Sequence, residues 1–184
     1  MRTVTAVAIL LLVAGPAFAQ DRLISPYRHQ AETGLRGLDQ REIAELKAGN
    51  GMGLARAAEL NSYPGPRHVL DAVAAGKLMA SAEQIQRVQR VFDEMQNDAR
   101  RVGAQILERE QQLEMGFQTA SITESDLRER VTRIAALQGE LRAIHLAAHL
   151  ATRAILSDSQ VARYNELRGY TTGSADRQEH QHKH

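Results

Sequence analysis

The stretch IQRVQRVFDEMQNDARRVGAQI, residues 85–106, decides the fold. Its apolar side chains recur at alternating steps of three and four residues, which places them along one face of an α-helix. They are Ile85, Val88, Phe92, Met95, Ala99, Val102 and Ile106. Because the apolar pattern resumes at Leu113 after an interruption at Arg109, it predicts a helix of about 37 residues and roughly 55 Å that begins after Ser81.

A second segment with the same periodicity runs from Glu124 to Leu156. Its apolar residues are Leu127, Val131, Ile134, Leu137, Leu141, Ile144, Ala148 and Ile155. Only residues 116–123 connect the two segments, and so short a connection forces the helices to run antiparallel. The sequence therefore predicts an all-α protein built on a long antiparallel helical hairpin.

The flanking sequence predicts four regions. Shorter helices are expected at 39–47, 54–60, 68–78 and 158–168, and a Pro- and Gly-containing break separates the second from the third. The regions are a signal peptide (1–19), a leader with a short helix (20–65), the helical hairpin domain (66–170) and a disordered, histidine-containing tail (171–184).

The first region predicts export to the periplasm. Arg2 precedes an apolar run, and Ala17-Phe18-Ala19 has the small-x-small pattern that a signal peptidase cleaves. The run is about a dozen residues, short of the roughly twenty that span a bilayer. No second apolar stretch of spanning length follows, so no stable membrane insertion is expected after cleavage. Retention as an uncleaved anchor is the alternative.

The composition indicates which partners and which stabilising interactions this chain can have. The chain has 23 basic and 22 acidic side chains, so it has no long-range field to attract nucleic acid. It has no Cys, which excludes disulfides and thiolate metal ligands. Stability must therefore come from helix packing, within the chain or across a dimer.

Each helix of the hairpin region begins with the same chemistry. A hydroxyl stands at the N-cap position, and an acid or amide follows three residues later, which is the spacing of a capping box. The pairs are Ser81 with Gln84, Thr123 with Asp126, and Ser157 with Gln160. At the third start, Leu156 and Val161 can also form a hydrophobic staple.

These helix starts carry a family resemblance. Leu156-Ser157-Asp158-Ser159-Gln160 resembles the Leu-Thr-x-x-Gln motif of the Spy/CpxP family of periplasmic stress proteins, with Ser for Thr, and residues 81–84 resemble a second copy without the leading Leu. The resemblance implies a helical hairpin that pairs into a homodimer. Its members include ATP-independent chaperones, inhibitors of envelope-stress kinases, zinc-binding stress proteins and CnrX-like nickel and cobalt sensors, so the resemblance does not choose one activity.

Two histidines on the second long helix predict a metal site. His145 and His149 are four residues apart, so their imidazoles lie on one helix face about 6 Å apart and can reach one divalent ion. At about 100° per residue, His145 faces the partner helix and His149 its border. A third ligand is needed, and His68 is the first candidate, followed by Glu59 and Met52. A buried, partnered histidine is the alternative interpretation.

The residues around the histidine pair do not predict catalysis. No acid follows His145, unlike in the His-Glu-x-x-His of zinc peptidases, so a general base for hydrolysis is missing. We therefore expect no enzyme activity and no organic cofactor, but a divalent transition metal, Zn, Cu, Ni or Co. The tail histidines His180, His182 and His184 can also chelate such ions with modest selectivity, or simply form a solvated terminus.

The functional prediction is a periplasmic metal-responsive stress protein that binds divalent heavy-metal ions, as a sensor or in resistance, without catalysis. The alternative is an ATP-independent periplasmic folding chaperone of Spy/CpxP type, in which arginines border a client-binding surface. The expected partners are a second copy of the chain and either unfolded envelope proteins or a membrane-bound signalling protein.

Overall fold

The computed structural model describes residues 24–30 and 34–170. The predicted signal peptide and tail lie outside the described residues. The chain divides into two units, Met1–Arg36 and Gly37–His184. In the first unit the structure describes one short 3-10 helix, η1 (Arg28–Gln30). All elements described below belong to the second unit.

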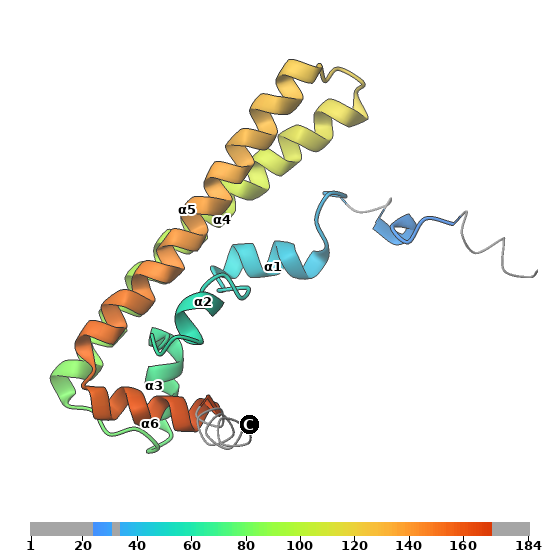
Figure 1. Cartoon of the computed structure of the whole chain (residues 1–184). Helices are drawn as coiled ribbons and strands as arrows, with labels where there is room; N and C mark the ends of the chain where they lie inside the picture. Colours follow the sequence, from blue (N-terminus) through green and yellow to red (C-terminus); the bar gives the residue numbers. More distant parts are fainter. Residues whose placement is uncertain (1–23, 31–33, 171–184) are drawn as a thin grey trace, which may run out of the picture. The chain divides into compact units, whose positions relative to one another are not determined.

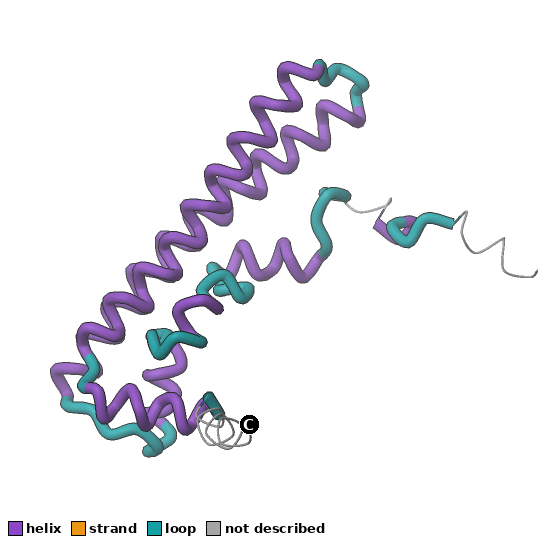
Figure 2. Tube along the Cα trace, in the orientation of Figure 1, coloured by secondary structure: helices purple, strands orange, loops and turns teal. Residues whose placement is uncertain are grey.

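The second unit is helical throughout the part that the structure describes (Figure 2). Its elements are α1 (Gln40–Ala48), α2 (Arg56–Glu59), α3 (Pro66–Ala74), α4 (Ala82–Gln118), α5 (Glu124–Ile155) and α6 (Asp158–Arg168). The two long helices, α4 and α5, pack side by side and run antiparallel (Figure 1), which confirms the predicted hairpin. None of the described helices combines the length and apolar character needed to cross a membrane.

The helix bounds follow the predicted ones closely, except at α2, at α3 and at the connection between the long helices. Helix α2 has four residues, whereas a helix over 54–60 is predicted. The connection between the long helices is shorter than predicted, because α4 continues to Gln118. Helix α3 ends at Ala74, although the pattern predicts a helix to Leu78, because Gly76 has a left-handed backbone with φ 68°. Beyond this break Leu78 still packs into the core, at 2% exposure.

Two apolar clusters hold the unit together. The first joins α1 to the hairpin and consists of Leu46, Ala99, Val102, Ile106, Leu137 and Leu141. The second joins α3 and α6 to the base of the hairpin and consists of Val69, Leu78, Val88, Leu156, Val161 and Tyr164. Val131, predicted on the apolar side of α5, is 48% exposed, since two helices alone cover only a narrow stripe of each other near the turn.

Helix α1 packs directly on α4. A Cβ at Gly103 of α4 would overlap the backbone carbonyl of Leu46, and the side chain of Arg100 donates to the carbonyl oxygen of Ala48 (3.2 Å). Glycine at this position therefore permits the close approach of two helix backbones. The sequence places α1 in the leader, whereas the structure packs it on the hairpin.

The predicted capping boxes at Ser81 and Ser157 are present, and their glutamines also bind each other. Nε2 of Gln84 donates to Oε1 of Gln160 (2.9 Å), and Nε2 of Gln160 donates to Oε1 of Gln84 (3.0 Å). Each Oε1 also accepts from its own N-cap amide, at 3.0 Å for Ser81 and 2.8 Å for Ser157. The paired amides therefore tie the start of α4 to the start of α6.

Replacing Gln160 with Ala should lower the free energy of unfolding by about 2–3 kcal/mol, because hydrogen bonds to the Ser157 amide, Gln84 and the Met79 carbonyl are lost together. Urea denaturation followed by circular dichroism measures the change. The exposed Gln86 on α4 is the matched control, and Gln86→Ala should leave stability nearly unchanged. Equal stability of the two variants would contradict the role of the glutamine pair.

Candidate metal-binding site

The structure brings the predicted ligands together around two adjoining cavities. His68, His145, His149 and Met52 line both cavities, and Glu59 lines one of them. The side chains come from separate elements, because the histidine pair is on α5, Glu59 ends α2 and His68 is in the first turn of α3. The close approach of α2 and α3 to α5 therefore creates the site.

His149 is held in a defined orientation. Its Nδ1 lies 2.7 Å from the backbone carbonyl oxygen of Tyr63, and the residue is 9% exposed. A carbonyl oxygen only accepts hydrogen bonds, so Nδ1 carries a proton, and Nε2 is the nitrogen whose lone pair a metal ion could use. In metal-binding histidines, a hydrogen bond at the nitrogen that does not bind the ion fixes the tautomer and the orientation of the ring in this way.

His145 is more deeply buried, at 3% exposure. Its Nε2 is buried and has no hydrogen-bond partner in the part of the chain that the structure describes. Burial, with a smaller contribution from His149, lowers the pKa of His145, so the imidazole is neutral at pH 7. A buried polar atom without a partner is costly, and a coordinated cation would supply the missing interaction.

Gly65 leaves space beside two of the candidate ligand atoms. Its φ of −76° and ψ of 138° are accessible to any residue, so its backbone does not require glycine. A Cβ at this position would lie 3.1 Å from Nε2 of His149 and 3.5 Å from Oε2 of Glu59. The absence of a side chain therefore keeps a small space open between an imidazole nitrogen and a carboxylate oxygen.

Met52 and His68 also line both cavities. Met52 has φ 44°, in the left-handed region that non-glycine residues rarely adopt. Burial and the positive charge of Arg168 lower the pKa of His68, against the opposite effect of Glu59 and Asp71. His68 therefore presents a neutral imidazole at pH 7, the form that binds metals.

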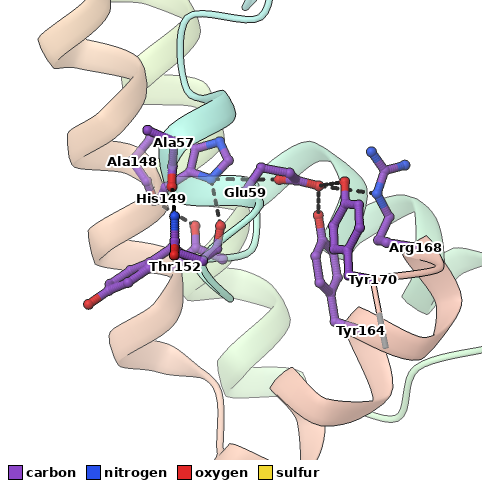
Figure 3. Close-up of polar contacts among 10 residues, drawn as sticks. Ala57, Glu59, Ala148, His149, Thr152, Tyr164, Arg168 and Tyr170 are labelled. Carbon is purple, nitrogen blue, oxygen red and sulfur yellow. Dashed lines mark hydrogen bonds and ion pairs between the residues drawn. The ribbon is translucent and has the colours of Figure 1, made fainter. Parts of the chain in front are cut away.

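Glu59 has partners that the sequence does not predict (Figure 3). Its Oε1 accepts hydrogen bonds from the hydroxyls of Tyr164 (2.6 Å) and Tyr170 (3.1 Å) and from Nε of Arg168 (3.1 Å). Burial would raise the pKa of Glu59, but these hydrogen bonds and the charge of Arg168 lower it. The carboxylate is therefore ionised at pH 7. No local spacing signals this cluster, because its donors are more than 100 residues away in sequence.

Within residues 24–30 and 34–170, no three His, Asp or Glu side chains are grouped so that they could hold a metal ion as they stand. The described unit is thus an all-α helical hairpin with a cavity lined by histidines. No known family, curated protein or solved structure matches this chain. Membership of the Spy/CpxP family stays a prediction.

The lowered pKa of His145 predicts a pH-dependent stability in the presence of EDTA. Below about pH 6.5 the unfolded chain binds a proton at this histidine more readily than the folded chain does, so the free energy of unfolding falls as the pH falls. His145→Gln should reduce the loss measured by urea denaturation between pH 7.5 and pH 5.5. Some dependence should remain, because the pKa of His68 is also lowered.

The matched control for this measurement is His29→Gln, which changes an exposed histidine outside the hairpin unit. It should leave the pH dependence as it is in the unmodified chain. If the free energy of unfolding of His145→Gln fell between pH 7.5 and pH 5.5 by as much as that of the unmodified chain, His145 would not be held neutral in the folded protein.

Proposed function

We propose that the protein is a metal-responsive envelope stress protein, which binds a divalent transition-metal ion as a sensor or in resistance and carries out no catalysis. The observation that carries this proposal is that His68, His145, His149 and Met52 line both of two adjoining cavities and that Glu59 lines the smaller one. The buried Nε2 of His145, which lacks a partner among the described residues, supports it. The periplasmic location rests on the predicted signal peptide.

The chemistry of the donors selects the class of ion. Imidazole nitrogens bind Zn, Cu, Ni and Co, and the thioether of Met52 suits softer ions. Calcium and magnesium prefer sites built from oxygen ligands, and Glu59 is the one carboxylate that lines the smaller cavity. In this proposal, His145 and His149 provide two ligands, and rotation of His68 or Glu59 within the cavity provides the third.

Isothermal titration calorimetry with Zn²⁺ tests the proposal. The full chain should bind the ion with micromolar or tighter affinity, and His145→Ala combined with His149→Ala should abolish that binding. Gly65→Ala should weaken it, because the new methyl group fills the space beside Nε2 of His149.

The predicted tail provides the control for this titration. Replacing His180, His182 and His184 with Asn removes the other candidate chelating group and should leave the tight binding in place. The proposal would be contradicted if the tail variant lost the heat of binding and the variant without His145 and His149 kept it.

The chaperone alternative is favoured by a different part of the molecule. Met115 (54% exposed) and Phe117 (58% exposed) lie at the end of α4 near the hairpin turn, and Val131 lies on the facing helix. Met115 also lines a groove with Arg109, Arg130 and Arg133. Exposed apolar groups bordered by charges form a surface on which an unfolded chain could bind loosely.

Light scattering of a denatured client protein tests the chaperone alternative. Equimolar protein should suppress aggregation without ATP, and Met115→Ser with Phe117→Ser should reduce the suppression because the apolar contact area is lost. Met79→Ser is the matched control, since Met79 is 82% exposed but lies in the loop before α4, at the opposite end of that helix from the turn. Unchanged aggregation with the unmodified protein would remove this alternative.

A further inference from the structure

The two oxygens of the Glu59 carboxylate face different parts of the fold. Oε1 accepts the three hydrogen bonds from Tyr164, Arg168 and Tyr170. Oε2 faces the hairpin, 3.7 Å from Nδ1 of His149, and borders the space beside Gly65. Figure 3 shows the carboxylate between His149 on one side and the two tyrosines and Arg168 on the other. One side chain thus connects the histidine site to the C-terminal helix.

The three donors form a fixed anchor at the end of α6. Tyr164 is 1% exposed and belongs to the apolar cluster at the base of the hairpin. Burial and the hydrogen bond to Glu59 raise the pKa of its hydroxyl, so it stays a donor. Arg168 also lies over the ring of Tyr170, 5.8 Å from its centroid. With Oε1 held from one side, the direction in which Oε2 points is restricted.

We propose that Glu59 binds the metal ion through Oε2 and that Tyr164, Arg168 and Tyr170 are its positioning residues, so that ion binding is coupled to the docking of the C-terminal end of α6. This inference rests on the proposed metal-binding function. Partners that orient a ligand typically change metal affinity by about 10- to 100-fold. Coupling between two binding equilibria is reciprocal, so a bound ion must stabilise the docking of Arg168 and Tyr170 by the same factor.

A structural ion pair between Glu59 and Arg168 alone would not place the carboxylate as observed. Such a pair needs one donor group, whereas Oε1 has three, and two of them are neutral hydroxyls that add no charge to oppose a cation. Oε2 meanwhile borders the space beside Gly65, which Nε2 of His149 also borders, and the backbone of Gly65 does not require glycine. One carboxylate oxygen is thus held by hydrogen bonds while the other faces the cavity, which is the arrangement expected of a carboxylate that binds a metal ion.

The test is a Co²⁺ titration of the full chain carrying the three tail substitutions, followed by the visible absorption of the bound ion. Tyr170→Phe removes one positioning hydroxyl from a half-buried side chain and should weaken binding by about tenfold. Its Co²⁺ spectrum should shift toward that of Glu59→Gln, which lacks the anionic ligand. Tyr63→Phe is the matched control, because Tyr63 contacts His149 through its backbone carbonyl, and it should match the unmodified protein.

Hydrogen exchange provides the reciprocal measurement. Co²⁺ should slow amide exchange at residues 165–170 in the unmodified chain and should have no such effect in Glu59→Gln. A merely structural role for Tyr170 would change stability without moving the Co²⁺ spectrum or this metal-dependent protection.

The outcomes separate this inference from the function on which it rests. If Co²⁺ binds in a manner that depends on His145 and His149, but Tyr170→Phe and Tyr63→Phe give the same affinity and spectrum, the coupling is overturned and the metal site stands. If the unmodified chain binds neither Co²⁺ nor Zn²⁺, both fall. A weakened, spectrally shifted Tyr170→Phe variant with an unchanged Tyr63→Phe control supports the coupling.

Discussion

The packing of α4 against α5 is the constraint on which the rest of the structure depends. The apolar stripe of α5 must face α4 to leave water, and His145 lies on that stripe between Leu141 and Ala148, both buried. The same packing that buries the leucines therefore buries an imidazole, at a cost unless the ring finds a partner. The site is thus a direct consequence of placing a titratable residue on a hairpin seam.

The short helices α1, α2 and α3 pack around this buried imidazole and leave a cavity beside it. Helix α1 approaches α4 closely at Gly103, α2 contacts α5, and α3 contacts both long helices. The glutamine pair fixes the start of α6 to the start of α4, which directs the end of α6 back toward Glu59. Ligands from distant segments meet because each segment is independently packed on the same two long helices.

The features that the sequence predicts well are those that depend on residues close together in the chain. Periodicity and capping boxes predict α4, α5 and α6 to within a few residues, and angular position predicts the burial of both α5 histidines. Features that depend on tertiary neighbours escape prediction. Val131 is exposed because its surroundings near the turn do not cover it, and the donors to Glu59 come from residues with no periodic relation to it. Longer-range contacts of this kind leave no trace in spacing.

A metal-responsive protein needs more than a set of ligands, because the ion must favour one arrangement of the chain over others. An ion held by α5 residues alone would bind a rigid helix and change little else. The carboxylate of Glu59 differs, since its donors belong to the last described residues before the tail. In the proposed site, binding energy would be transmitted to the C-terminal end of α6 through this one side chain, so we expect a response to the ion to be detected first at that end.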